Sequence, residues 1–147
     1  MKVLAVASAG GHWLQLLRLK PAFDYSELVF ISTRDSFSEF VPESRFYAIR
    51  DFSRKNKIDI IRSLREVWRI VASEKPDVIL TTGAAPGLIV IIVGALCSCK
   101  TIWVDSIANV EKLSLSGKIA SVFADRVYTQ WPHLASKKVI YAGNVIS

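Results

Sequence analysis

The sequence predicts an α/β protein with a doubly wound, mainly parallel sheet, built as a single domain over residues 1–147. Three observations lead to this prediction. Short apolar runs of strand length alternate with helical stretches along the whole chain. Of all residues, 51% are hydrophobic and only 22% are charged, as expected for a sheet covered on both faces. Small-residue turns follow two of the apolar runs, where strands would pass into helices.

The first part of the chain alternates strand and helix around a glycine-rich turn. Residues 3–7 form an apolar run that predicts a buried strand, and the turn Ser8 to Gly11 follows it. Apolar residues then recur with helical spacing from Trp13 to Leu19, until Pro21. Residues 28–31 and 45–49 are predicted as further strands, joined by a polar connection over residues 32–44.

A long amphipathic helix is predicted from Lys57 to Ser73, ending before Pro76. Its expected core face consists of Ile58, Ile61, Leu64, Trp68 and Val71. The pattern continues with a strand over 78–80, a small-residue loop over 81–87, an apolar helix over 88–96 and a strand over 101–104. The remaining elements are a helix over 114–123, a strand over 126–128, a helical turn over 131–135 and a strand over 139–141.

Charge and cysteine content narrow the function classes. A formal charge of +6 favours an acidic partner, such as a phosphorylated ligand or an anionic membrane. No platform of interleaved aromatic and basic residues supports nucleic-acid binding. Cys97 and Cys99 have no second pair to complete a metal site and are interpreted as reduced thiols of a cytosolic protein. The longest apolar stretch, residues 87–97, falls short of the ~20 residues that span a bilayer.

Ligands of open parallel sheets bind outside the carboxyl ends of the strands, so the loops that follow the strands are the candidate site. The first loop offers Ser8, Gly10 and Gly11 before a helix start, where backbone amides favour an anion such as pyrophosphate. The second loop offers Thr82, Gly83, Ala84, Pro86 and Gly87. The alternatives are a tight turn without a ligand for the first loop and close helix packing for the second.

Polar residues at the same edge are candidates for chemistry. His12, at the helix start, can act as a general base or bind an anion, since imidazole titrates near neutral pH. Packing or capping is the alternative for this histidine. Asp105, Asn109 and Glu111 follow the fifth strand and can serve as an acid or base, bind hydroxyl groups, or cap the next helix.

Basic residues gather in and before the long helix, where they can contact anionic lipid headgroups. The proposed membrane contacts are Arg62, Arg65 and Arg69, and the cluster also includes Arg50, Arg54, Lys55 and Lys57. A solvated helix face is the alternative explanation.

Five motifs, in this order, resemble the PssD/CpsF-type polysaccharide biosynthesis proteins. They are ASAGGHWLQLL, TTGAAPG, WVDSIANVEKLSLSGKI, ADRVYTQWPHL and YAGNV, and the resemblance covers nearly the whole chain. This family is related to the membrane-bound subunit of the eukaryotic transferase that adds the second N-acetylglucosamine to dolichol pyrophosphate. It is also similar to the amino-terminal, Rossmann-like half of MurG-type GT-B glycosyltransferases.

The resemblance implies an acceptor-binding subunit of a two-chain glycosyltransferase in capsule or exopolysaccharide synthesis. The glycine loops would bind the pyrophosphate of a polyprenyl-linked sugar, and His12 would deprotonate the acceptor hydroxyl. Eukaryotic relatives carry a glutamate where this chain has Gln15, which cannot act as a base. The resemblance implies no cofactor and no metal.

A donor-binding catalytic partner is also implied, with Trp131, Pro132 and Tyr141 expected at the interface. The expected location is cytoplasmic, peripherally on the inner face of the cell membrane. A stand-alone nucleotide-binding regulatory module without catalysis remains the alternative function.

Overall fold

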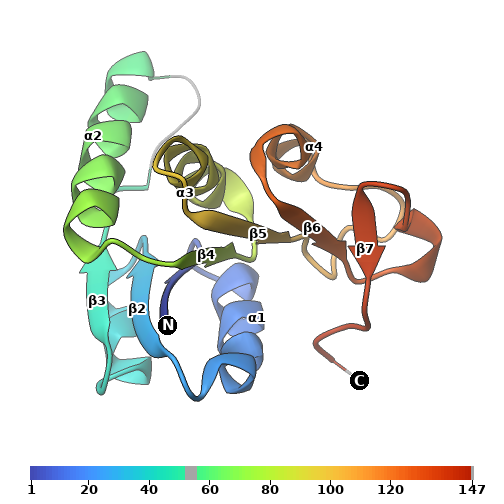
Figure 1. Ribbon diagram of the computed structural model, residues 1–147, viewed down its shortest axis with the longest axis horizontal. Coiled ribbons are helices and arrows are strands. Elements are labelled where there is room, and N and C mark those ends of the chain that lie inside the picture. Colours follow the sequence, from blue (N-terminus) through green and yellow to red (C-terminus); the bar gives the residue numbers. More distant parts are fainter. Residues whose placement is uncertain (52–55, 147) are drawn as a thin grey trace.

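The computed structural model describes residues 1–51 and 56–146. Its strands form one parallel sheet of seven strands in the spatial order β3-β2-β1-β4-β5-β6-β7 (Figure 1). The strands are β1 Lys2–Val6, β2 Glu27–Ser32, β3 Arg45–Ala48, β4 Val78–Thr81, β5 Lys100–Val104, β6 Arg126–Thr129 and β7 Val139–Tyr141. Because the winding direction reverses between β1 and β4, the sheet is doubly wound. The predicted fold class is confirmed.

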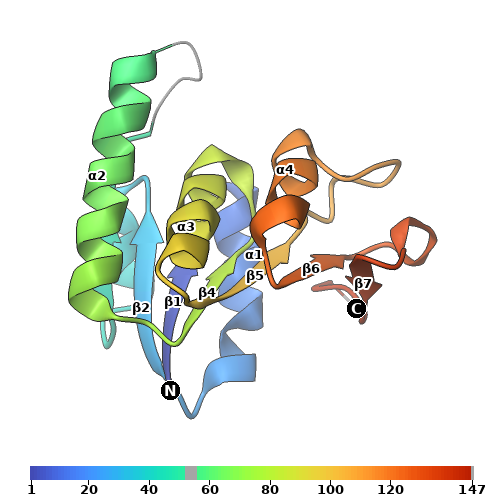
Figure 2. The same cartoon turned by 45° about the horizontal axis from the view of Figure 1, so that its top comes forward.

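Helices cover both faces of this sheet (Figure 1 and Figure 2). One face, called here the three-helix face, carries α2 (Lys57–Glu74), α3 (Ala84–Leu96) and α4 (Leu115–Phe123). The opposite face carries α1 (Gly11–Leu19) and the short 3-10 helices η1 (Lys20–Phe23) and η2 (Asp35–Phe40). A last short helix, η3 (Pro132–Leu134), precedes β7.

The strands feed two hydrophobic cores because successive side chains point to opposite faces of a sheet. In β1, Leu4 and Val6 belong to the core under the three-helix face, whereas Val3 and Ala5 pack with α1. Trp13 of α1 is buried in this second core and stacks on Phe37, with the ring centroids 5.1 Å apart. The indole therefore anchors the first turn of α1 on the sheet.

The structure corrects the expected start of the fourth helical segment. Residues 84–87 were expected in a loop, but α3 begins at Ala84 and includes Pro86 and Gly87. Proline fits the first helical turn because the amide it lacks has no partner inside the helix there. Gly87 is buried, and a Cβ at this position would collide with the hydroxyl of Thr81. Close helix-to-sheet packing, the alternative named for this loop, therefore accounts for Gly87.

The expected core face of the long helix is also wrong in part. Ile58, Ile61 and Trp68 are exposed, whereas Val67 and Ile70 are buried. Apolar residues extend round more than one side of α2, and periodicity alone does not tell which side meets the sheet. The polar connection over residues 32–44 differs as well, because it contains η2.

A buried carboxylate organises the amino end of the sheet. Glu74, at the end of α2, accepts hydrogen bonds from the Tyr47 hydroxyl at 2.6 Å, from Lys2 Nζ at 3.3 Å and from Arg45 Nη1 at 3.1 Å. Burial alone would raise the pKa of Glu74, but the hydrogen bonds from Tyr47 and Lys2 and the charge of Arg45 outweigh it and lower this pKa. Accordingly, the hydrogen bond to Glu74 raises the pKa of Tyr47.

Candidate functional site

The loop after β1 forms an open corner at the carboxyl end of the sheet. Gly10 precedes α1 with φ of 92°, a conformation that disfavours any side chain. Gly10 and Gly11 are exposed, and a Cβ on either would meet no atom within 4 Å. Among the described residues no side chain caps α1. In its first turn the amide of Trp13 donates to the Gly10 carbonyl at 3.1 Å, whereas the amides of Gly11 and His12, which have no partner inside the helix, are available to a ligand.

His12 joins this corner to the loop after β4. Its Nδ1 donates a hydrogen bond to the backbone carbonyl of Thr82 at 2.8 Å, and the Thr82 hydroxyl donates to the His12 carbonyl at 2.7 Å. Because the Nδ1–H group donates a hydrogen bond to a carbonyl, the neutral ring has its lone pair on Nε2. The half-buried imidazole is thus held in the tautomer that can accept a proton at Nε2.

The second loop is shaped to let the imidazole approach. Gly83 adopts φ of 125°, and a Cβ there would lie 3.0 Å from both Cε1 and Nδ1 of His12. Ala84 follows with φ of 65°, an uncommon conformation for a residue with a side chain. No described side chain caps α3 either. The starts of α1 and α3 therefore meet at His12, whereas Pro86 is buried within α3.

In the loop after β5, the carboxylate of Asp105 is bonded on both oxygens by groups of the protein itself. This carboxylate is buried and accepts hydrogen bonds from the Trp103 indole at 3.0 Å and the Asn109 amide at 3.0 Å. It also accepts from the Ser114 backbone amide at 2.9 Å and the Ser114 hydroxyl at 2.6 Å. These bonds hold the loop to Ser114, the residue that caps α4, as in the capping alternative for this segment. Glu111 lies exposed on the same loop.

A pair of buried glutamines connects these loops, and sequence reasoning assigned them no such role. Gln15 Oε1 accepts from the Gln130 side chain at 2.7 Å and from the Ile107 amide at 3.1 Å. Gln15 Nε2 donates to the hydroxyl of Ser106 at 3.1 Å, and Gln130 also donates to the carbonyl of Asp105 at 3.0 Å. Gln130 directly follows β6, so the rule that placed Asp105 at this edge could have found it.

The predicted membrane contacts lie on α2. Arg62, Arg65 and Arg69 are exposed and line a groove of about 670 Å³ together with Asp59 and Glu66. Arg54 and Lys55, from the same basic cluster, lie outside the described residues. Within the described chain, none of the helices has both the length and the hydropathy that crossing a bilayer requires.

The residues expected at a partner interface differ in exposure. Trp131 is half-buried, and its indole donates to the Ile107 carbonyl at 2.8 Å, so it serves at least in part to hold the loop after β5. Pro132 and Tyr141 are exposed.

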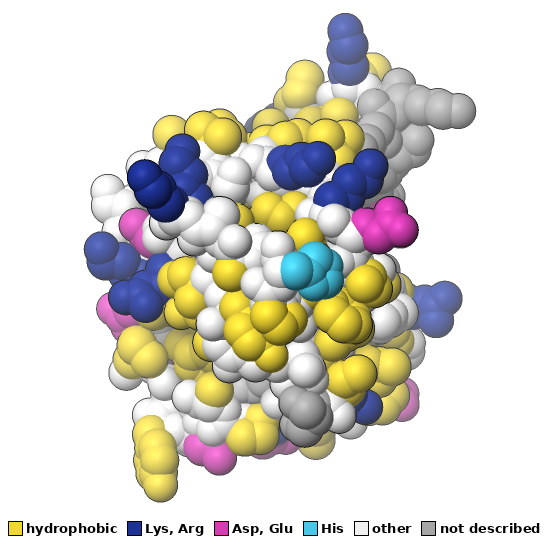
Figure 3. All heavy atoms as spheres, turned by 90° about the vertical axis from the view of Figure 1, so that its right-hand side faces the viewer, with side chains coloured by type: hydrophobic (Ala, Val, Ile, Leu, Met, Phe, Trp, Pro, Cys, Tyr) yellow, Lys and Arg dark blue, Asp and Glu magenta, His cyan; other side chains and the backbone are white. Residues whose placement is uncertain are grey.

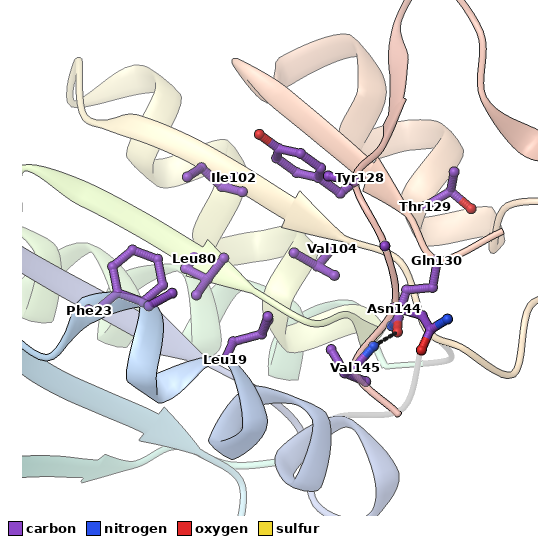
Figure 4. Close-up of a pocket in the computed structure, with 13 residues that line it drawn as sticks. Leu19, Phe23, Leu80, Ile102, Val104, Tyr128, Thr129, Gln130, Asn144 and Val145 are labelled. Carbon is purple, nitrogen blue, oxygen red and sulfur yellow. Dashed lines mark hydrogen bonds between the residues drawn. The ribbon is translucent and has the colours of Figure 1, made fainter. Parts of the chain in front are cut away.

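An apolar pocket of about 300 Å³ opens nearby between α1, the sheet and residues 142–145. Figure 4 shows Phe23, Leu80, Ile102 and Val104 around this pocket, and the hydrogen bond from the Val145 amide to Gln130 at its rim.

Metal-binding groups do not assemble in the described part of the chain: it holds no cluster of three His, Cys, Asp or Glu residues suited to a metal ion. Cys97 and Cys99 are free thiols at the end of α3. Burial raises the pKa of Cys99.

Comparisons with known sequences identify one family. The family profile described as "Oligosaccharide biosynthesis protein Alg14 like" matches residues 32–145. The UDP-N-acetylglucosamine transferase subunit ALG14 of Mus musculus is 28% identical over 186 aligned positions, covering 99% of this chain and 83% of the mouse protein. The subunit of Schizosaccharomyces pombe is 43% identical over 67 residues, covering 42% of this chain and 32% of the yeast protein.

Solved structures with the same fold include longer enzymes. MurG of Acinetobacter baumannii superposes with a TM-score of 0.79 at 13% identity, covering 97% of this chain and 46% of MurG. UDP-N-acetylglucosamine 2-epimerase of Rickettsia bellii gives a TM-score of 0.75 at 13% identity, covering 99% of this chain and 45% of the epimerase. This chain therefore corresponds in fold to slightly less than half of either enzyme.

Proposed function

The chain belongs to the Alg14-like family of oligosaccharide biosynthesis proteins, and from that premise we propose that it is the acceptor-binding, membrane-recruited subunit of a two-chain glycosyltransferase. A separate catalytic chain binds the UDP-sugar donor in this proposal, and the acceptor is a saccharide on a polyprenyl pyrophosphate. Residues 1–147 act as the acceptor-binding domain. The relatives named as UDP-N-acetylglucosamine transferase subunits support both the donor class and the division into subunits.

The contact between His12 and the loop after β4 carries the proposal. It brings together two helix starts without side-chain caps and a histidine with its free electron pair on Nε2. Positive helix ends stabilise the charge of a diphosphate, which Gly10 and Gly11 allow to approach the backbone. His12 Nε2 then removes the proton from the acceptor hydroxyl as that oxygen attacks the anomeric carbon of the donor sugar, while the bond from this carbon to UDP breaks and UDP leaves with the electron pair. Ser8, Gly83 and Ala84 complete the proposed acceptor site, and the buried Thr82 contributes to it by holding His12.

An apolar pocket beside the sheet supports a partner chain. Ile102, Val104 and Tyr128 line this pocket next to α1, together with residues 142–145. A sheet with buried strands excludes water best when both faces are covered. We place part of the interface here, next to the exposed Tyr141 and Pro132.

The biological context follows from the motif resemblance. The order of the motifs favours the PssD/CpsF-type branch, and with it capsule or exopolysaccharide synthesis on the inner face of the cell membrane. The net charge of +6 suits peripheral contact with anionic lipids.

The proposal is tested by reconstitution with a separate donor-binding chain. We expect transfer from a UDP-sugar to a polyprenyl-pyrophosphate saccharide only when both chains are present. His12→Ala should lower the rate by about 100-fold or more, because general-base catalysis contributes that much. The matched control is His133→Ala, at the other and exposed histidine, which should keep the rate.

Both variants should still co-elute with the partner. Full transfer by this chain alone would contradict the two-chain proposal, and an unchanged rate in His12→Ala would remove the histidine from the mechanism. Calorimetric binding of a free nucleotide to the isolated chain, without binding of lipid pyrophosphates, would instead favour a regulatory nucleotide-binding module.

A further inference from the structure

The turn after α3 brings the two cysteines of the chain together. Cys97 ends α3 as its C-cap, and Ser98 follows with a φ of 59°, in the left-handed region. The backbone amides of Cys97 and Cys99 both donate to the carbonyl of Gly94, at 3.1 Å and 2.9 Å. Because one carbonyl accepts from both amides, the backbone between the cysteines is folded and not extended. This folding brings their Cα atoms close together, as a disulfide requires.

The side chains of Cys97 and Cys99 lie on the same side of this turn. Both are half-buried, and both pack against the hydrophobic core of the three-helix face. Both also line a recess of about 390 Å³, together with Lys75, Pro76 and Asp77. Cys99 Sγ lies 4.0 Å from the Cys97 carbonyl oxygen. The two thiols therefore share one recess that a small reagent can reach.

The two thiols also influence each other's charge. Burial, the neighbouring Cys97 thiol and the Asp77 carboxylate all raise the pKa of Cys99. Because the effect of one charge on another needs a short distance, this shift agrees with thiols that lie close together. A thiol with a raised pKa is rarely ionised and is a slow first nucleophile. We therefore expect Cys97 to react first with an electrophile and Cys99 to react second.

Two thiols without further ligands favour a redox reaction over a metal site. Among the described residues, no group of three His, Cys, Asp or Glu could hold a metal ion. Cys97 and Cys99 are free, and the sequence contains no other cysteine. An internal disulfide of this chain can therefore form only between these two residues.

The charges around the turn favour an anionic reagent. Lys75 lines the recess, Lys100 directly follows Cys99, and both lysines are exposed. The carboxylate of Asp77, in the same recess, accepts a hydrogen bond from the Lys2 amide at 2.7 Å. Figure 3 shows Lys and Arg side chains spread over the surface that it views, in keeping with the net charge of +6. Oxidised glutathione carries more carboxylates than amines, so these cations favour its approach.

We infer that Cys97 and Cys99 form a reversible redox pair, a modification site whose reagents are small disulfides such as oxidised glutathione. The thiolate of Cys97 attacks one sulfur of the small disulfide, whose S–S bond breaks, and the other sulfur leaves as a thiolate. The thiolate of Cys99 then attacks the Cys97 sulfur of this mixed disulfide and displaces the second small thiol. The two protons of the cysteines end on the two released thiols. The pair loses two electrons, and the small disulfide gains them.

The redox pair lies at the amino end of the sheet, because the turn leads directly into Lys100, the first residue of β5. The proposed acceptor site lies at the carboxyl end, so the inference does not depend on the proposed function. A disulfide that spans a single residue closes a small, strained ring, and strained disulfides are easily reduced. We therefore expect the dithiol in an excess of small thiols and the disulfide when small disulfides accumulate.

The test is equilibration of the purified chain with mixtures of reduced and oxidised glutathione, followed by maleimide labelling and mass spectrometry of the intact chain. With increasing oxidised glutathione we expect a monomer that has lost two hydrogen atoms, carries no glutathione and no longer reacts with maleimide. Dithiothreitol should restore labelling of both thiols. Cys99→Ser should instead accumulate one glutathione at Cys97, and Cys97→Ser should acquire glutathione at Cys99 severalfold more slowly.

The matched control is Ser98→Cys/Cys99→Ser, which keeps two thiols but makes them adjacent in sequence. A disulfide between adjacent residues requires a distorted or cis peptide bond, so this control should retain glutathione and form no internal disulfide. Thermal unfolding should show that all variants are folded. The inference would be overturned by an unchanged chain that keeps glutathione on both cysteines, that forms disulfide-linked dimers, or that matches the control.

Discussion

The two ends of the parallel sheet use polar residues in opposite ways. At the amino end, Glu74 is enclosed by hydrogen bonds from Tyr47, Lys2 and Arg45, so the charges satisfy one another. At the carboxyl end, the described residues engage only Nδ1 of the His12 ring in a hydrogen bond, and a Cβ on Gly10 or Gly11 before it would meet no atom within 4 Å. The polar groups around Glu74 therefore bond to one another, whereas His12 keeps one ring nitrogen for a ligand.

This difference helps to separate structural from functional residues at the carboxyl end itself. Asp105 lies beside the candidate site, yet it is enclosed by donors as completely as Glu74 is. We therefore expect a polar residue at a ligand-binding edge to bind a ligand only if part of its bonding capacity remains open.

The largest effect is expected at Asp105. Asp105→Ala leaves the buried indole of Trp103 and the half-buried donors of Asn109 and Ser114 without an acceptor, which should cost about 3–5 kcal/mol of unfolding free energy. Urea denaturation measures this loss. Glu111→Ala, at an exposed acid of the same loop, should change stability little. A fully stable Asp105→Ala chain that fails in sugar transfer would restore a catalytic role for Asp105.

The next largest effect is expected at Gly83, which lies against the ring of His12. Gly83→Ala places a Cβ 3.0 Å from the His12 ring and should displace it from the Thr82 carbonyl, lowering transfer by about 100-fold. Gly143→Ala is the control, since φ of 109° strains this residue too but no atom lies within 4 Å of the added Cβ. NMR shifts of the His12 ring nitrogens should change only in Gly83→Ala. Equal kinetic losses in both variants would assign the effect to backbone strain.

Gln15 should show a smaller, purely structural effect. Gln15→Leu removes the acceptor for the Ile107 amide and the Gln130 side chain, at a cost of about 2 kcal/mol. Gln15→Glu keeps an oxygen for both donors and can accept from the Ser106 hydroxyl, so its loss in chemical denaturation should be smaller. Equal losses in the two variants would show that the hydrogen bonds contribute little.

Much of the fold could be predicted from local patterns. The runs over residues 3–7 and 28–31 are continuously apolar because both faces of a parallel sheet are buried, and the structure confirms them as strands. The start of α3 was missed because proline and glycine usually mark loops, although proline suits a first helical turn. The buried side of α2 could not be predicted, because spacing reveals a stripe but not the surface that it contacts.

The location of the candidate site could be predicted from the sequence, but most contacts within it could not. The rule for parallel sheets put His12 and Thr82 at one edge, but their hydrogen bond joins residues far apart in sequence. The same holds for Gln15 and Gln130, whose pairing depends on how α1 and β6 meet. For Asp105, residue type and position left a chemical role and a capping role open, and the donors that enclose it could be found only from the folded chain.

The smallest effect is expected at the amino end, and it depends on pH. Because the pKa of Glu74 is lowered below its ordinary value of 4.5, the folded chain binds this proton less readily than the unfolded chain. The stabilisation is therefore complete above that ordinary value and is lost as pH falls through the lowered pKa.

Tyr47→Phe removes one hydrogen bond to the carboxylate and should cost about 1 kcal/mol at neutral pH, with a smaller loss in acid. Unfolding free energies measured across acidic pH should converge for the two chains, whereas Glu39→Gln, at an exposed glutamate, should leave the profile unchanged. A constant difference in unfolding free energy at every pH would mean that Tyr47 stabilises the fold by packing and not through its hydrogen bond to the Glu74 carboxylate. The contrast between this enclosed carboxylate and the ligand-binding end of the sheet would then not hold.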